Sequence, residues 1–335
     1  MPEHSLPGSR TRACAPAATR TPLAQGPLPI LAAAVLWGTT GTAGSFAPEG
    51  APAAAVGAAG LVLGGLLLFL TGRGSVALVV RSDRSTRWTL ALGALAVAGY
   101  PLAFYPAVAS AGVAVATVIT LGSAPVFSGL LAWLTGHSRP TARWTVATAA
   151  AVLGCAVLVL GSELGGGGSA VRPAGVFLAL AAGFSYSAYA LVAERLIRRG
   201  HSSPAVMGTL FAGGGIAVLP VVLATGTAWL ATVNGALVAL HLAVFTVFLA
   251  YRLFGHGLRH TSASVATTLT LAEPAVAALL GVLVVGERLS AVSWTGLAVL
   301  ALGLAVLRAP ARRSPGPADT EQGVNGPGHG TAPAP

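Results

Sequence analysis

Two acidic residues in one of the most apolar stretches of the sequence are the first candidates for chemistry. Residues 267–289 read TTLTLAEPAVAALLGVLVVGERL, with Glu273 in the middle and Gly286 and Glu287 near the end, where we expect a turn at the outer surface. Glu273 lies twelve residues from either end of the apolar run 261–285. A charged side chain at the centre of a membrane-spanning helix costs about 2.5–3.5 kcal/mol on insertion scales, so such residues usually face the protein interior and serve a function.

Three interpretations of Glu273 are open. It binds a cationic or amine substrate or a proton; it is a structural carboxyl group hydrogen-bonded to the backbone that Pro274 loosens; or it reaches a water-filled cavity as solvated surface. Thr270 and Thr267, three and six residues earlier, share its face of a helix, so we expect a polar stripe there.

Polar and aromatic side chains recur at helical spacing in the other apolar segments, and we expect them around a central cavity. The candidate lining residues are Trp37, Thr39, Thr42, Tyr100, Thr117, Thr120, Ser123, Ser185, Tyr186, Tyr189, Thr267, Thr270 and Glu273. A serine or threonine in a membrane helix often bonds only to its own helix or to a neighbouring one, which is the competing structural role. His241 is a second candidate proton carrier, against a simple hydrogen bond to a neighbour. Tyr105 lies nearer the outer end of its segment and is expected to be an interface anchor.

The composition indicates which kind of protein must position these residues. Charged residues are 8% of the 335, whereas a soluble domain has about 25%. Hydrophobic residues are 54%, and the mean hydropathy is +0.78. This composition excludes one large soluble domain and predicts an all-α integral membrane protein. The two cysteines, Cys14 and Cys155, form neither a disulfide framework nor a metal-ligand spacing, and we expect no metal and no cofactor.

Ten apolar segments of about 17–24 residues have the length that crosses a hydrocarbon core of about 30 Å as a helix. Their ranges are 27–47, 52–70, 89–109, 112–134, 144–161, 173–193, 205–225, 235–253, 261–285 and 291–307. If the N-terminus is cytosolic, seventeen arginines fall on inner segments and only Arg172 and Arg288 on outer ones, as the positive-inside rule requires. Both termini are therefore expected in the cytosol, and the net charge of +10 is interpreted as topological and not as a nucleic-acid surface.

The fourth and fifth segments are similar to the ninth and tenth. Three pairs of positions align after a single-residue gap, namely Pro125 with Pro274, Gly136 with Gly286 and Trp144 with Trp294. We therefore expect two five-helix repeats, 27–161 and 173–307, joined by a Gly-rich linker, 162–172. Because each repeat has an odd number of spans, the second repeat is inverted in the membrane relative to the first. Transporters with inverted repeats have their binding site near the midplane where the halves meet, and we expect a central cavity there. The tails 1–26 and 308–335 are expected to be disordered in the cytosol.

Three segments together resemble the EamA-type members of the drug/metabolite transporter superfamily. They read ILAAAVLWGTTGTAGSF, SAGVAVATVITLGSAPVFSGLLAWL and LAEPAVAALLGVLVVGERLS, and with the ten-segment pattern the resemblance covers nearly all of 27–307. It implies a ten-helix secondary transporter that moves small metabolites, amino acids or drugs without ATP. The first repeat departs from the family at Gly136-His137, where a Gly-Glu pair is usual and where the second repeat keeps Gly286-Glu287. The role of the first-repeat turn is left open.

The sequence thus predicts a transporter and not an enzyme. The leading expectation is a secondary active exporter of small metabolites, amino acids or drugs in the bacterial inner membrane, working by alternating access of two inverted repeats. The alternative within transport is a multidrug cation/proton antiporter centred on Glu273. A membrane enzyme or scaffold is the remote alternative, because Asp83, Glu194 and the loop histidines form no catalytic constellation. The expected partners are a small-molecule substrate and the lipid bilayer, without nucleic acid; coupling to protons is a hypothesis, and the protein is expected to be a monomer or a homodimer.

Overall fold

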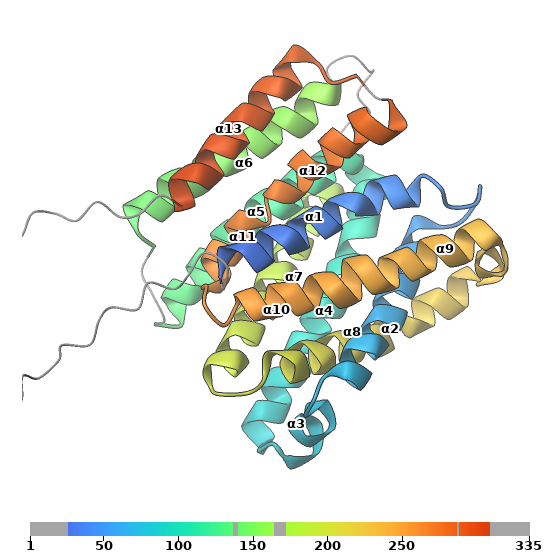
Figure 1. Cartoon of the computed structure of the whole chain (residues 1–335), viewed down its shortest axis with the longest axis vertical. Helices are drawn as coiled ribbons and strands as arrows, with labels where there is room; N and C mark the ends of the chain where they lie inside the picture. Colours follow the sequence, from blue (N-terminus) through green and yellow to red (C-terminus); the bar gives the residue numbers. More distant parts are fainter. Residues whose placement is uncertain (1–25, 137–139, 164–171, 287, 309–335) are drawn as a thin grey trace, which may run out of the picture.

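The computed structural model describes residues 26–136, 140–163, 172–286 and 288–308. Within these residues the chain folds into helices and has no strand (Figure 1). Several sequence predictions concern positions outside the described residues, namely the tails up to residue 25 and from residue 309, most of the Gly-rich linker, His137 and Glu287.

In chain order, some helices precede the Gly-rich linker and the others follow it. The first half forms α1 (Pro27–Gly44), α2 (Ala53–Thr71), α3 (Ser75–Arg81), α4 (Arg84–Ala111), α5 (Val113–Leu134) and α6 (Ala142–Glu163). The second half begins with α7 (Pro173–Arg198), α8 (Ser203–Thr225), the 3-10 helix η1 (Ala228–Ala231), α9 (Val233–His241), the π-helical η2 (Leu242–Leu249) and α10 (Ala250–Gly257). It ends with α11 (Ala263–Leu269), α12 (Ala272–Leu280), the π-helical η3 (Gly281–Val285) and α13 (Ala291–Arg308).

Eight helical segments of the described chain are long and apolar enough to cross a membrane. They are Ala53–Thr71, Arg84–Ala111, Val113–Leu134, Ala142–Gly161, Pro173–Arg198, Ser203–Thr225, Val233–Gly257 and Ala263–Val284. They coincide with eight predicted spans, and the other two, 27–47 and 291–307, form α1 and α13, of 18 residues each. Large apolar side chains such as Phe177 (73% exposed) and Ile216 (72% exposed) cover the outside of the bundle, which suits contact with lipid. The predicted all-α class is therefore confirmed.

The segment after α2 contains helical structure that the pattern of apolar residues did not predict. The short helix α3 precedes α4, and α4 begins at Arg84, several residues before the predicted span. Asp83 explains the early start, because its Oδ2 accepts the backbone N–H groups of Ser85 and Thr86 at 3.0 and 3.3 Å. The predicted break between the third and fourth spans is present at Gly112, whose φ of +84° lies in the region that glycine adopts without strain.

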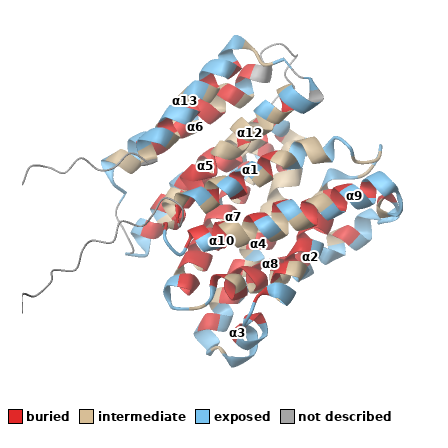
Figure 2. Ribbon diagram, viewed as in Figure 1, coloured by how far each residue is buried: buried red, intermediate tan, exposed pale blue. Residues whose placement is uncertain are grey.

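Helices of the two halves pack against each other. α6 packs on α13, α2 on α8, α4 and α5 on α7, and α1 on both α10 and α12. In Figure 1 the α6–α13 pair lies along the upper side of the bundle. Buried residues, red in Figure 2, gather where the other helices meet. Glycines allow close approach at the pair, since Gly154 lies against the backbone of Leu300 and Gly296 against that of Leu158.

The ninth predicted span is broken between α11 and α12. Pro274 has no N–H to donate to the carbonyl of Thr270, four residues earlier. The N–H of Glu273 donates to that carbonyl at 2.9 Å, which makes this turn tighter than an α-helix. Glu273 therefore lies in the first turn of α12, at a discontinuity of the helix. Pro125, the aligned residue of the first half, lies inside the continuous helix α5.

Candidate functional site

A cavity of about 600 Å³ lies inside the bundle, lined by side chains of both halves. We call its lining residues the cavity wall. At one end the wall includes Val113, which is 66% exposed, and Leu289; this end is the cavity mouth. At the other end it includes Tyr189 and Phe211, 3% and 2% exposed; this is the closed end. The cavity is therefore open toward one face of the bundle.

Two helices that run in opposite directions connect the mouth to the closed end. Gly175, at the start of α7, lies against Ala111, at the end of α4. Gly93, in the first half of α4, lies against Val192, near the end of α7. Ala111 is two residues from Val113 at the mouth, so Gly175 and the start of α7 also lie at the mouth. α7 then passes Tyr189 at the closed end, and its C-terminal end lies beyond it.

Glu273 is part of the cavity wall and, among the described residues, the one acidic side chain in it. The ion pair found in the described part of the chain joins Arg198 to Glu194, so no described arginine pairs with Glu273. A carboxyl group without a cationic partner in a mostly apolar cavity is a costly arrangement that suits a cationic ligand or a proton. Gly38 of α1 makes room beside it, since a Cβ there would lie 3.1 Å from the Glu273 carbonyl oxygen.

Aromatic rings form the closed end of the cavity. The ring centroids of Phe211 and Tyr251 are 3.8 Å apart, and those of Trp37 and Tyr251 are 4.9 Å apart. Their polar atoms have partners: Trp37 Nε1 donates to the Thr246 carbonyl at 2.8 Å, and the hydroxyls of Tyr189 and Tyr251 lie 3.1 Å apart. The closed end is therefore an aromatic wall, and aromatic rings are groups that attract organic cations.

The structure divides the sequence-predicted site residues into two sets. In the cavity wall are Trp37, Tyr100, Thr117, Tyr186, Tyr189 and Glu273. Outside it are Thr39, Thr42, Thr120, Ser123, Ser185, Thr267 and Thr270. Five hydroxyls of the second set bond to carbonyl groups, as Thr120 does to Ala179 at 3.0 Å and Thr267 to Ala263 at 3.0 Å; the five are those of Thr39, Thr120, Ser123, Thr267 and Thr270. This is the structural role that competed with cavity lining in the sequence.

His241 also lies outside the wall. Its Nε2 is 2.9 Å from Thr39 Oγ1, and its ring lies 5.1 Å from that of Phe245. This contact ties the end of α9 to α1, which is the neighbour-bonding arrangement weighed against a proton carrier. At the repeat ends, Gly286 has a φ of +80° and Gly136 one of +70°, so both turns use a backbone conformation that favours glycine.

The wall also contains residues that the sequence did not single out, notably Phe211, Tyr251 and Thr246. Tyr105, expected to be an interface anchor, lies in the wall with its ring against Gly57. An aromatic residue in an apolar run looks the same whether it faces lipid or a cavity, so these positions carry no local signal.

Comparison with known proteins identifies the family. The EamA-like transporter family matches residues 25–160 and again residues 173–309. The protein named uncharacterized transporter YwfM of Bacillus subtilis (strain 168) is 38% identical over 285 residues, which are 85% of this chain and 94% of that protein. The protein named uncharacterized inner membrane transporter YicL of Salmonella typhimurium (strain LT2) is 25% identical over 299 residues, which are 86% of this chain and 97% of that protein.

A solved crystal structure shares the fold. It superimposes with a TM-score of 0.70 at 22% sequence identity, covering 84% of this chain and 95% of that chain. The two tandem family matches confirm the resemblance found in the sequence and show that the family sequence occurs twice in the chain. The chain is therefore a multi-pass membrane protein that belongs to the EamA-like transporter family.

Proposed function

We propose that the protein is a secondary active transporter that exports a small organic solute across the bacterial inner membrane. The observation that carries the proposal is the cavity of about 600 Å³, whose wall includes Glu273, a residue that pairs with no arginine of the described chain. Its size falls within the range of about 300–1,000 Å³ typical of small-molecule sites. The family and the names of its relatives support transport over a membrane enzyme or a scaffold.

The architecture we propose is ten spanning helices in two inverted repeats. Counting α1 and α13 as spans gives five in each half, with α1 corresponding to α7, α2 to α8, α4 to α9–α10, α5 to α11–η3 and α6 to α13. Two helices then pack on their own counterparts, α2 on α8 and α6 on α13. The contact of α4 with α7 corresponds to that of α10 with α1. Reciprocal pairs of this kind support a pseudo-two-fold axis between the halves and alternating access around the cavity.

Arginine placement supports an orientation with the closed end in the cytosol. Arg198 lies at the C-terminal end of α7, beyond the closed end. Arg252 Nη1 donates to the Thr71 carbonyl at 3.5 Å, and Ser202 Oγ donates to the Arg73 carbonyl at 3.2 Å, so the ends of these helices meet on the same side. By the positive-inside rule this side is cytosolic, with both termini. The mouth then faces outward, the state in which an exporter releases its solute.

Multidrug cation/proton antiport is the second candidate, and one observation favours it. Glu273 shares the cavity wall with Trp37, Tyr100, Tyr186 and Tyr251. A single carboxylate among aromatic rings is an arrangement that binds organic cations through charge and through the ring faces. On this proposal a proton and a cation compete for Glu273, so binding of one releases the other.

Transport in proteoliposomes tests both candidates. The purified protein is reconstituted and supplied with amino acids, other small metabolites and lipophilic cations, with and without an imposed pH gradient. Protein-free liposomes are the control. We expect at least one solute class to enter faster than in the control; gradient-driven cation uptake would select the antiporter. If no solute moves under either condition while the protein is folded and inserted, the proposal is wrong.

A further inference from the structure

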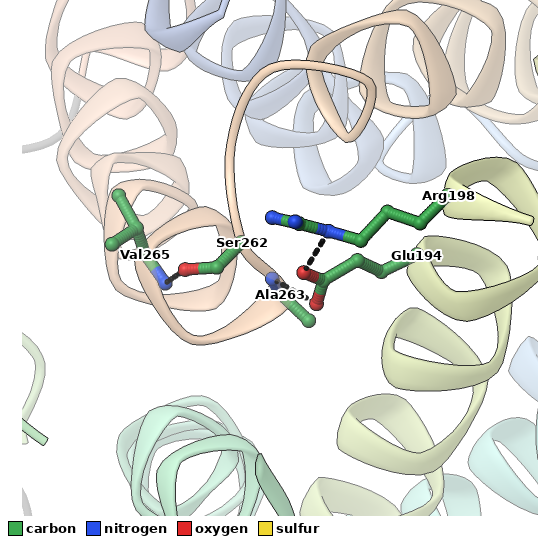
Figure 3. Close-up of polar contacts among 5 residues, drawn as sticks. All are labelled: Glu194, Arg198, Ser262, Ala263 and Val265. Atoms are coloured by element: carbon green, nitrogen blue, oxygen red, sulfur yellow. Dashed lines mark hydrogen bonds and ion pairs between the residues drawn. The ribbon is translucent and has the colours of Figure 1, made fainter. Parts of the chain in front are cut away.

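A second carboxylate, Glu194, lies beyond the closed end of the cavity, near the C-terminal end of α7. The residue is 7% exposed. Its Oε2 accepts the backbone N–H of Ala263 at 2.8 Å, and its Oε1 lies 2.8 Å from Nε of Arg198 (Figure 3). The side chain of Arg198 is 59% exposed, so the buried contact of Glu194 is the one with the Ala263 amide.

Ala263 is the first residue of α11, and Glu194 therefore caps this helix from a distant part of the chain. The first N–H groups of a helix have no partner within it and need acceptors. Ser262 supplies one locally, since its Oγ accepts the N–H of Val265 at 3.4 Å (Figure 3). Glu194 supplies another acceptor as a carboxylate, and hydrogen bonds to charged acceptors are the stronger kind.

The other end of α11 is also held by α7. The hydroxyl of Tyr186 donates to Thr270 Oγ1 at 2.8 Å. Tyr186 and Glu194 are eight residues apart, about 12 Å along a helix, and Ala263 and Thr270 are seven residues apart, about 10.5 Å. Because the two spacings match, side chains of one helix hold both ends of α11.

α11 also contacts the first half of the chain through α6. Trp144 Nε1 donates to the Ser264 carbonyl at 3.2 Å, and the hydroxyls of Thr148 and Thr268 lie 3.0 Å apart. α11 therefore bridges α6 and α7 beyond the closed end. Its C-terminal end leads into the break before α12, where Glu273 faces the cavity.

We propose that Glu194 is a positioning residue for the transport cycle. It holds α11 alongside α7 in this state, and release of the Ala263 amide lets α11 move and opens the closed end of the cavity. This inference rests on the proposed transport function, since it assigns one step of alternating access to a single contact. The same movement acts on the break before α12 and changes the position of Glu273.

The test uses a cysteine reporter on α11. The reporter position is Ala266, which is 0% exposed. The substitution Ala266→Cys is made in a variant in which the two natural cysteines, Cys14 and Cys155, are replaced by alanine. The rate of labelling by a hydrophilic maleimide is measured in nanodiscs, where both faces of the protein are accessible. Labelling then reports movement of α11 without a known substrate and without regard to orientation.

Two variants break the same contact from its two sides. Glu194→Ala removes the acceptor. Ala263→Pro removes the donor and puts the ring carbon Cδ where the amide hydrogen pointed, so the Glu194 carboxylate must turn away. The helix tolerates this change, because proline is favoured at the first helical position and Ser262 already has the extended φ of −70° and ψ of 154° that a following proline requires. We expect each to raise the labelling rate about tenfold or more, as the loss of a hydrogen bond to a charged group implies. Glu194→Gln keeps an acceptor oxygen but loses the charge, so its labelling rate should lie between those of the parent and Glu194→Ala.

Two control variants separate positioning from general loosening. Asp83→Ala removes a carboxylate cap of the same kind from α4, and Arg198→Gln removes the exposed ion pair; both should label at the parent rate. Unchanged labelling in both Glu194→Ala and Ala263→Pro, with intact helical content, would overturn the inference. So would equal labelling of Asp83→Ala and Glu194→Ala. If labelling behaves as expected but no solute moves in proteoliposomes, the proposed function fails and the role of Glu194 in closing the cavity stands.

Discussion

Two glycines on α1 allow a sharp test of how this helix supports Glu273. Gly38 and Gly41 are both in the cavity wall, three residues apart on one helix. A Cβ at Gly38 would lie 2.7 Å from Cβ of Val276 and 3.1 Å from the Glu273 carbonyl oxygen, whereas a Cβ at Gly41 would meet nothing within 4 Å. The same substitution, glycine to alanine, is therefore crowded at one position and free at the other.

The expected magnitudes follow from these surroundings. Alanine in a helix interior is favoured over glycine by about 0.5–1 kcal/mol. Forcing an extra carbon into a packed site costs about 1–3 kcal/mol. Gly41→Ala should therefore be neutral or slightly stabilising. Gly38→Ala should lower the free energy of unfolding by about 1–2 kcal/mol and push α12, with Glu273, away from α1.

Thermal unfolding of the purified protein measures this difference. At about 2–4 °C per kcal/mol for chains of a few hundred residues, Gly38→Ala should unfold about 4 °C or more below Gly41→Ala. Equal midpoints for the two variants, or a lower midpoint for Gly41→Ala, would refute the packing of α1 against α12 described above.

Three further predictions concern single side chains. Glu273→Gln should weaken binding of tetraphenylphosphonium about tenfold or more, measured by calorimetry, because it removes the one acidic side chain that the described residues contribute to the cavity wall; unchanged affinity would exclude the cation site. Trp37→Phe should lower the unfolding free energy by about 1 kcal/mol through loss of the bond to the Thr246 carbonyl, and an unchanged midpoint would show that this bond is not stabilising. Hydrogen bonds from the side chain and the backbone N–H of Thr86 lower the pKa of Asp83, so its cap stabilises the protein near neutral pH and is lost as the pH falls below about 4. Thermal midpoints between pH 7 and 3 should fall less in Asp83→Asn than in the parent, and parallel curves would contradict this reading.

The sequence was sufficient to predict the all-α class and the long apolar helices, though not the short helix α3, because membrane depth imposes a length and a composition on each span. It was less informative about where a helix breaks. Pro125 and Pro274 occupy aligned positions, yet only the second lies at a break. The second repeat has Thr270, whose hydroxyl bonds to the Thr267 carbonyl and to Tyr186, where the first repeat has Leu121. The polar partners that accompany a broken turn become visible only when the helices are packed.

The candidate site shows the same limit. Glu273 was found from sequence because a carboxyl group at membrane depth is rare and costly. Hydroxyl groups such as that of Thr120 can instead donate a hydrogen bond to a nearby carbonyl group. Whether a hydroxyl does so or lines a cavity depends on which helix lies beside it. Phe211 and Tyr251 were missed for the opposite reason, since nothing in an apolar run distinguishes a ring that faces a cavity from one that faces lipid.

The most direct test of the account is solute flux in proteoliposomes for the parent protein and Glu273→Gln, matched for amount of inserted protein. The solute is the one that the parent transports best, and flux is followed with and without an imposed pH gradient. The account predicts that the parent moves the solute and that Glu273→Gln loses most of this flux or its response to the gradient. Equal flux and equal response in the two proteins would show that the carboxyl group in the cavity is not part of the transport site.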